Sequence, residues 1–254
     1  MHKYFFILVS AMMLTACGEN ESEPLDTEIA EPEKGSNGNL ETYAKRHVEA
    51  QLQILGTENY SLKIYKANLD GDDKMDAIIT VNRYENALKT AAQSPNPSKQ
   101  AEIGFMGNHN YFFFYDGSLD LISPPIVVPS SPMLPLEIGF EDITSTLYKD
   151  ILVTYRVRNS AYKAFFTVTN HSPVRYFEWP LYENLGQPNC KANGFQYLST
   201  ASNPRKNILI YEAMVTLSDT VSNFNIAIPT LKNTGKKRYE FFYLPAKQTY
   251  VTQK

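Results

Sequence analysis

An acidic turn leads directly into an apolar, β-branched run in the stretch Asn68-Leu69-Asp70-Gly71-Asp72-Asp73-Lys74-Met75-Asp76-Ala77-Ile78-Ile79-Thr80-Val81. Asp, Asn and Gly favour tight turns, whereas Ile, Val and Thr favour strands. The same pattern returns in residues 142–155, where Asp142 precedes Asp150 by eight positions, as Asn68 precedes Asp76. The chain is therefore predicted to repeat a unit in which a turn is followed by a buried strand.

A third and fainter copy ends at Asn207, which is followed by another apolar run. The closing residues Asp76, Asp150 and Asn207 are 74 and 57 residues apart, and an aromatic segment follows each of them. These spacings suit a repeating unit of about four strands. Residues 84–100 and 124–135 are predicted to be loops that lengthen the first unit. The alternative is an antiparallel sandwich whose turns favour Asp and Asn.

Composition favours strands over helices. The 254 residues include 17 Tyr and 14 Phe, which fit a pleated, half-buried surface. One N-terminal α-helix is predicted, because Asn39 is a favourable N-cap and Gly56 a favourable stop. Its apolar face consists of Leu40, Ala44, Val48, Leu52 and Leu55. Residues 40–254 are therefore predicted to form a single, mainly β domain with three degenerate antiparallel repeats.

The first 16 residues have the three parts of a secretion signal. Lys3 gives a positive head, Tyr4–Leu14 is an apolar stretch, and small residues precede Cys17. The apolar stretch is shorter than the roughly 20 residues that a permanent membrane-spanning helix needs. Residues 1–16 are predicted to be removed as a signal peptide that ends before Cys17. The alternative is an ordinary signal peptide followed by a chance cysteine.

The segment Leu14-Thr15-Ala16-Cys17 resembles the lipobox of bacterial lipoproteins. The resemblance implies a thioether-linked lipid on Cys17, cleavage before this residue, and N-acylation with a fatty acid such as palmitate. Two or three acyl chains anchor a protein stably, whereas a single chain binds a membrane only marginally. Because residue 18 is Gly rather than Asp, the enterobacterial sorting rule implies the outer membrane.

Residues 17–39 are predicted to be the lipidated cysteine and an acidic, disordered tether. Seven acidic residues face Lys34 alone here, and few large apolar side chains could offset the entropy of ordering. The net charge of the chain is −3, but without Lys3 and this segment 22 basic and 20 acidic residues are left. Nucleic-acid binding is not expected, because the chain lacks a basic stripe that would neutralise phosphates.

Oxygen-bearing side chains are spaced regularly through the first turn. Asn68, Asp70, Asp72 and Asp76 occupy its positions 1, 3, 5 and 9, and Gly71 permits a tight bend. Ca²⁺ takes roughly six to eight oxygen ligands from carboxylates, carbonyls and water. The turn is therefore predicted to bind one structural Ca²⁺ ion. A metal-free acidic turn is the alternative.

The same turn resembles the calcium loop of FG-GAP and VCBS repeats, the blades of integrin-α-like β-propellers, whose pattern is Asp-x-Asp-Gly-Asp-Gly-x-x-Asp. The ligands that this resemblance implies are the side chains of Asn68, Asp70, Asp72 and Asp76 and the carbonyl of Lys74. Asn68 replaces the first Asp of the pattern, and Asp73 replaces its second Gly. The second copy has Thr144 and Thr146 instead of carboxylates, so it is predicted to bind no metal, as is the third. The resemblance also implies blade-like repeats in a partial or irregular β-propeller-like fold.

The chain after the signal contains no HExxH, P-loop, GxSxG or CxxC motif. Ser160 and Lys163 match SxxK, but residues i and i+3 of a strand point to opposite faces. His109 and His171 lie in Asn-rich segments and are interpreted as turn residues. Cys190 has no basic neighbour in sequence that would lower the pKa of its thiol. Paired carboxylates of a glycoside hydrolase have no fixed sequence spacing, so this chemistry stays open.

These patterns favour a non-enzymatic, lipid-anchored envelope protein. Its β domain is expected to bind an unidentified protein or polysaccharide partner, or to have a structural role, with Ca²⁺ stabilising the fold. One alternative is a hydrolase acting on envelope or extracellular glycans or peptides, and another is an accessory lipoprotein of an envelope complex. An apolar-rimmed groove with convergent carboxylates would favour the hydrolase, whereas a flat aromatic patch would favour binding.

Overall fold

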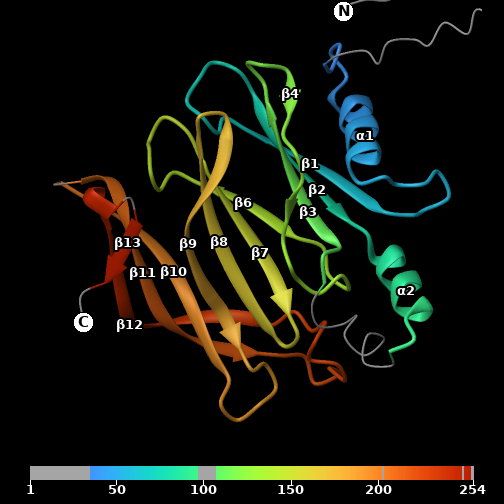
Figure 1. Ribbon diagram of the computed structural model, residues 1–254. Coiled ribbons are helices and arrows are strands. Elements are labelled where there is room, and N and C mark those ends of the chain that lie inside the picture. The colour runs from blue at the N-terminus through green and yellow to red at the C-terminus, as the bar shows by residue number, and fades with distance from the viewer. Residues whose placement is uncertain (1–34, 97–106, 202, 248, 253–254) are drawn as a thin grey trace, which may run out of the picture. The chain divides into compact units, whose positions relative to one another are not determined.

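The computed structural model describes residues 35–96, 107–201, 203–247 and 249–252 (Figure 1). Strands predominate among these residues, and neighbouring strands pair in antiparallel fashion. The predicted mainly β, antiparallel fold is therefore confirmed. The predicted signal peptide, residues 1–16, and the predicted lipidation site Cys17 lie outside the described residues.

The first sheet has five strands. They are β1 (Ser61–Ala67), β2 (Asp76–Asn82), β3 (Asn110–Asp116), β4 (Leu121–Ile122) and β5 (Ile126–Val127). Strands β1 to β4 are neighbours in chain order, and the short β5 pairs with β3. The central β2 is buried along nearly its whole length, because other elements cover both faces of the sheet.

The second sheet has eight strands in chain order. They are β6 (Glu137–Glu141), β7 (Asp150–Val157), β8 (Ser160–Thr169), β9 (Ser172–Glu183), β10 (Lys191–Thr200), β11 (Asn203–Thr216), β12 (Thr230–Leu244) and β13 (Thr249–Thr252). Strands β9 and β10 share the residue pairs Glu183–Lys191 and Tyr182–Ala192. This narrow junction divides the sheet into two four-stranded meanders, β6–β9 and β10–β13 (Figure 1). They are called the second and third meanders, and strands β1–β4 of the first sheet are the first meander.

Strands β7 and β8 lie between two apolar cores. One face contributes Val153 and Phe166 to a core shared with the first sheet, where the rings of Phe112 and Phe166 are 5.2 Å apart. The other face contributes Leu152 and Phe165 to a core shared with β11, β12 and β13. Successive side chains of a strand point to opposite faces, so one pair of strands serves both cores. The sheets therefore pack face to face, consistent with the antiparallel sandwich that the sequence left as the alternative to blade-like repeats.

The predicted N-terminal helix is α1 (Leu40–Gln51). Asn39 caps it, since its side-chain oxygen accepts the backbone N–H of Thr42 at 3.1 Å. The helix packs on the first sheet through Tyr43, Ala44 and Val48. It ends before the predicted stop at Gly56, because Gln53 takes a left-handed backbone conformation with φ of 50°.

A second helix, α2 (Tyr84–Gln93), lies within the segment 84–100 that was predicted to be a loop. The prediction was wrong for these residues. Ala87 and Ala91 are buried one helical turn apart, but two alanines make a weaker apolar stripe than the large side chains that mark an amphipathic helix. The helix ends just before Ser94, which precedes Pro95, and proline disfavours helical conformation in the residue before it.

Residues 35–39, predicted to be the end of the tether, belong to the described fold. Ser36 donates its backbone N–H to the two carboxylate oxygens of Asp120, at 3.1 and 3.0 Å. Gly35 is buried against the same carboxylate with φ of +84°, and a Cβ at this position would stand 2.4 Å from Asp120 Oδ2. Tertiary contacts therefore hold Gly35 and Ser36 against Asp120, a few residues before α1 begins.

Candidate metal site

The turn between β1 and β2 uses its own polar side chains to shape its backbone. Asn68 Oδ1 accepts the N–H of Gly71 at 3.1 Å, and Asp70 Oδ1 accepts the N–H of Asp72 at 3.1 Å. Asp72 Oδ1 in turn accepts the N–H of Lys74 at 2.7 Å. Such bonds between Asn or Asp side chains and nearby backbone are typical of tight turns. Gly71 has φ of +85°, which only glycine adopts without strain.

Asp76 closes this turn from inside the protein. It is fully buried, and its two carboxylate oxygens accept the backbone N–H groups of Leu69 and Gly117, each at 2.9 Å. Burial raises the pKa of Asp76 to about 6, and the negative charges of Asp70 and Asp72 act in the same direction against the two backbone hydrogen bonds. Asp76 therefore joins the turn to the connection between β3 and β4.

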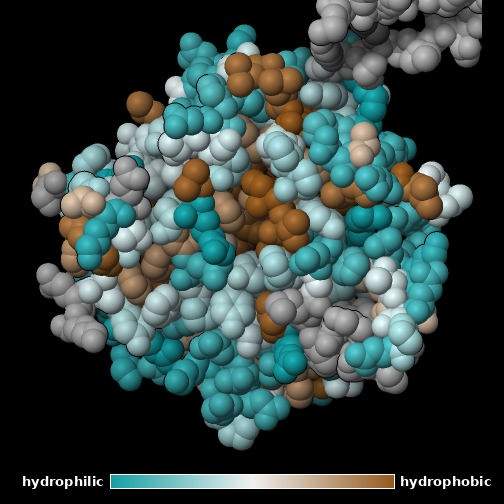
Figure 2. Space-filling model, in the orientation of Figure 1, coloured by the Kyte–Doolittle hydropathy of each residue, from teal (hydrophilic) through white to brown (hydrophobic). Residues whose placement is uncertain are grey.

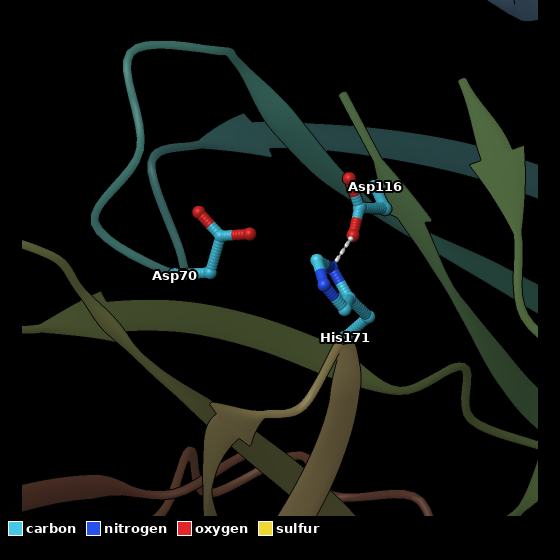
Figure 3. Close-up of side chains that lie close together, drawn as sticks. All are labelled: Asp70, Asp116 and His171. Atoms are coloured by element: carbon cyan, nitrogen blue, oxygen red, sulfur yellow. Dashed lines mark hydrogen bonds and ion pairs between the residues drawn. The ribbon is translucent and has the colours of Figure 1, made fainter. Parts of the chain in front are cut away.

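Three side chains of types that can bind metals converge beside the turn (Figure 3). Potential ligand atoms of Asp70, Asp116 and His171 all lie within 4.8 Å of one another. No other set of three or more His, Cys, Asp or Glu side chains is this close among the described residues. The residues come from the β1–β2 turn, the end of β3 and the turn between β8 and β9, so the cluster joins the first sheet to the second.

Asp116 is the buried anchor of the cluster. Its side chain is 4% exposed, and its Oδ2 lies 2.6 Å from Nδ1 of His171, whose side chain is 56% exposed. Its Oδ1 accepts the N–H and O–H of Ser118 and the N–H of Leu119. Burial acts to raise the pKa of Asp116, but the hydrogen bonds from Ser118, Leu119 and His171 outweigh it and hold the pKa below its usual value.

His171 is presented by a two-residue hairpin turn, as its Asn-rich surroundings predicted. Thr169 pairs with Ser172, and Asn170 and His171 between them have φ of 50° and 59°. A two-residue turn with two positive φ angles matches the right-handed twist of the flanking strands, and glycine is the favoured residue at its second position. The side chain at position 171 therefore has a conformational cost that glycine would avoid.

The turn between β6 and β7 closes in the same way as the first. Asp150 is fully buried, and its Oδ2 accepts the N–H of Ile143 at 2.9 Å, seven residues earlier, as Asp76 accepts that of Leu69. Asp150 also accepts the N–H of Thr144 at 2.6 Å and its hydroxyl at 2.7 Å. Burial raises the pKa of Asp150, and these hydrogen bonds oppose the rise.

Strand register shows which side chains correspond in the two turns. Asp76 begins β2 beside Asp116 at the end of β3, and Asp150 begins β7 beside Thr167 near the end of β8. Thr144 is six residues before Asp150, as Asp70 is before Asp76. Thr144 therefore takes the place of Asp70 in the turn, and Thr167 on β8 takes the place of Asp116 on β3.

The chemistry at the corresponding positions differs. The hydroxyls of Thr144 and Thr167 lie 3.3 Å apart, and a hydroxyl can both donate and accept. Ionised carboxylates can only accept, so Asp70 and Asp116 cannot hydrogen-bond to each other. The facing side chains of the two sites therefore differ in the partners that they can bind.

The predicted third copy has no comparable turn. Thr200 pairs with Asn203 across a two-residue connection, and Asn207 lies inside β11 opposite Leu198. The Asn207 side chain donates to Glu240 at 3.0 Å instead of closing a loop. In the third meander, the strands β10 and β11 are therefore joined by a short hairpin connection and not by an eight-residue turn.

The observed cluster shares one residue, Asp70, with the ligand set predicted from sequence. Asn68, Asp72, Lys74 and Asp76 surround the same turn but are not part of the cluster. Asp116 could have been noticed as an acidic residue that ends the aromatic run Tyr111–Tyr115. His171 carries no such signal, because only the stacking of the second meander on the first brings it to Asp116.

No protein-family model, curated protein or solved structure matches this chain. Within the part of the chain that the structure describes, no helix combines the length and apolar character needed to cross a membrane.

Proposed function

We propose that this protein is a lipid-anchored component of the cell envelope whose β domain has a non-enzymatic binding or structural role and is stabilised by Ca²⁺. The observation that carries the proposal is Leu14-Thr15-Ala16-Cys17, a complete lipobox at the end of an apolar stretch. Lipidation of Cys17 with two or three acyl chains would hold the protein stably on a membrane.

The anchor is tested by replacing the cysteine. Wild-type protein should incorporate labelled fatty acid and partition into the detergent phase, whereas Cys17→Ala should do neither. Ser22→Ala, a substitution downstream of the motif, is the control and should behave like wild type. Acylation of the Cys17→Ala protein would overturn the proposal.

The binding role is supported by an apolar groove between the two sheets. Figure 2 shows apolar residues gathered near the centre of the face that it draws. A groove of about 350 Å³ has β5 on one side and strands β7–β9 on the other, and its apolar lining includes Val127, Val153 and Phe166. Arg175 and Glu178 also line it and pair with each other at 2.8 Å. A mostly apolar groove with a few polar groups at its edge is typical of ligand-binding sites.

A second groove, of about 690 Å³, lies between α1 and β1 and contains carboxylates. Two of its three glutamates are already engaged. Glu58 binds Arg83 through two contacts of 2.6 Å, and this pairing holds the pKa of Glu58 below its usual value. Glu49 accepts the hydroxyl of Tyr60 at 3.0 Å. A glycosidase needs a carboxylic acid with a raised pKa that can reach the substrate, so this arrangement favours binding over hydrolysis.

Carboxyl groups with a raised pKa occur elsewhere in the described chain, at Asp76 and Asp150. Both side chains are fully buried and accept hydrogen bonds from turn backbone. A general acid must come within hydrogen-bond reach of the atom that it protonates. Their burial therefore favours a structural role for these two acids.

Ca²⁺ at the first turn is supported by charge and by available oxygen atoms. Asp70, Asp72 and Asp73 carry three negative charges beside the single positive charge of Lys74. Asp70 and Asp72 bond to the turn through Oδ1, and no described residue hydrogen-bonds to their Oδ2 atoms. Carboxylate oxygens around a tight turn are the ligands that Ca²⁺ favours.

A further inference from the structure

We propose that Asp70, Asp116 and His171 bind a divalent transition-metal ion of the Zn²⁺ class, which fastens the β8–β9 hairpin to the first sheet. This site goes beyond the Ca²⁺ proposed for the turn 68–76. Two of its three residues lie outside that turn, and only Asp70 is common to both.

The donor set distinguishes the two ions. Ca²⁺ takes oxygen ligands almost exclusively, whereas Zn²⁺ is bound by imidazole nitrogen together with carboxylate oxygen. Two carboxylates and one imidazole leave at least one coordination position for water. The imidazole of His171 therefore makes this cluster more suitable for a transition metal than for Ca²⁺.

The three side chains already face one another. Figure 3 shows the imidazole of His171 between the carboxylates of Asp70 and Asp116, and the ligand atoms are within 4.8 Å of one another. With bonds of about 2.0–2.2 Å, neighbouring ligand atoms around Zn²⁺ are about 3.3 Å apart. On the same bond-length basis, a separation at the 4.8 Å limit has to shorten by about 1.5 Å, and the 2.6 Å between Asp116 Oδ2 and His171 Nδ1 has to widen by about 0.7 Å.

The nitrogen that faces Asp116 can act as a ligand. His171 Nδ1 lies 2.6 Å from Asp116 Oδ2, and the His171 side chain is 56% exposed. When the imidazole carries its proton on Nε2 and presents it to water, Nδ1 has a free electron pair. The metal ion then takes the place of the proton in the Asp116–His171 hydrogen bond.

Electrostatics gives a second reason for a cation at this position. Asp116 is nearly fully buried, and Asp70 stands beside it without a hydroxyl partner. The corresponding positions of the second meander hold Thr144 and Thr167, whose hydroxyls bond to each other or to Asp150. A divalent ion neutralises the two carboxylates of the first cluster, whereas the two threonines of the second carry no charge and need no ion.

The proposal is tested by titrating the full-length, detergent-extracted protein with Zn²⁺ alone and measuring heat. The parent carries Cys190→Ser, because a free thiol is itself a zinc ligand. One ion should bind per chain. His171→Gly should bind it at least about 10- to 100-fold more weakly, since even the loss of an outer-shell partner has effects of that size. Glycine is the favoured residue at this turn position, so the variant keeps its hairpin.

Two matched variants distinguish this cluster from zinc binding elsewhere on the chain. His109→Gln removes a histidine outside the cluster, and Asp72→Asn removes a carboxylate of the predicted Ca²⁺ set, and both should bind Zn²⁺ like the parent. Equal Zn²⁺ affinity of the parent and His171→Gly, or no binding by the parent, would overturn the proposal. A Ca²⁺ titration of the same proteins reports on the first turn independently, because His171→Gly should leave its result unchanged.

Discussion

The turns 68–76 and 142–150 close their strands with the same buried aspartate geometry but have opposite side-chain chemistry around it. In each turn the aspartate that begins a strand accepts a backbone N–H from seven residues earlier, at 2.9 Å. Around Asp76 stand Asp70, Asp72 and Asp116, whereas around Asp150 stand Thr144 and Thr167. The buried aspartate closes both turns, whereas Asp70 and Asp72 form further bonds to backbone N–H groups within the first turn alone.

The two turns also contact each other, so a change in one acts next to the other. The N–H of Lys149 donates to the carbonyl of Asn68 at 2.9 Å, and the ring of Tyr148 lies against Gly71. The second turn is joined to the third meander in a similar way, by a 2.9 Å bond from the N–H of Lys206 to the carbonyl of Ile143. The turn before β2 thus links the first meander to the second, and the turn before β7 links the second meander to the third.

The largest change in stability is expected when a threonine of the second turn is replaced by the aspartate found at the corresponding position of the first turn. Thr144→Asp places a carboxylate in a site that is 6% exposed, next to Asp150. An uncompensated buried charge costs about 3–5 kcal/mol, so the free energy of unfolding should fall by about that amount at pH 7. Urea denaturation measures the loss. Thr144→Ser keeps the hydroxyl and should lose no more than about 1 kcal/mol with one methyl group. Equal stability of Thr144→Asp and wild type would contradict the proposed difference between the turns.

A smaller loss of folding free energy is expected for a substitution at Gly117, which packs closely against Met75 of the first turn. A Cβ on Gly117 would stand 2.4 Å from the carbonyl oxygen of Met75, so Gly117→Ala must push the turn away from β3. Overpacking of this kind costs about 1–3 kcal/mol. Thermal unfolding of Gly139→Ala gives the comparison, because its nearest neighbour would be Leu152 Cβ at an ordinary 3.8 Å. If both variants melt at the same temperature, the close approach at Gly117 does not affect stability, and the prediction is wrong.

Ca²⁺ should stabilise the protein through the first turn by a moderate amount. Extracellular Ca²⁺ modules have dissociation constants of about 10⁻⁴–10⁻³ M, so millimolar Ca²⁺ is about tenfold above the tighter limit. Binding to the folded state alone then adds about 1.4 kcal/mol, or a few degrees in Tm. Melting curves in EDTA and in millimolar Ca²⁺ measure the shift.

The matched variants for this prediction both lie in the first turn. Asp72→Ala removes a predicted ligand and should abolish the Ca²⁺-dependent shift in Tm. Asp73→Asn removes one negative charge from an exposed position outside the predicted ligand set and should keep the shift. Coincident wild-type curves with and without Ca²⁺ would show that the acidic turn is stable without a metal.

The smallest effect concerns the first position of the second turn, where Asp142 corresponds to Asn68. Asp142 pairs with Lys206 at 2.8 Å, and this contact holds the pKa of Asp142 below its usual value. A carboxyl group with a lowered pKa stabilises the fold above its unfolded pKa, and the contribution disappears as the pH falls through the folded value. Lys206→Gln should therefore lower the free energy of unfolding at pH 7 by at most about 1 kcal/mol. Urea titrations should show a smaller difference from wild type at pH 3, and a difference that grows in acid would exclude this ion pair as its cause.

Local sequence pattern was sufficient to predict the elements with strong periodicity. Asn39 marked the start of α1, and the acidic turns marked the starts of β2 and β7 at Asp76 and Asp150. Caps and turns depend on residues a few positions apart, so their chemistry is visible in the chain itself. The same reasoning missed α2, whose buried face consists of Ala87 and Ala91.

The candidate site could be predicted only in part. Asp70 was visible, because it lies in a turn with other acidic residues, and the wider Ca²⁺ set stays a prediction. Asp116 reaches the cluster through the register of β3 on β2, and His171 reaches it from a hairpin 55 residues further along the chain. No local spacing relates these residues, since the packing of one meander on another determines their distance.

The sequence by itself determined that the chain is rich in strands, begins its folded part with a helix, and repeats a turn closed by aspartate. These properties follow from backbone preferences and from short-range side-chain bonds, which act over fewer than about ten residues. Tertiary structure alone decided that Gly35 and Ser36 contact Asp120 and that His171 stands beside Asp116. Such contacts arise when apolar faces such as those of β7 and β8 are buried, because burial brings distant segments together without regard to their separation in the chain.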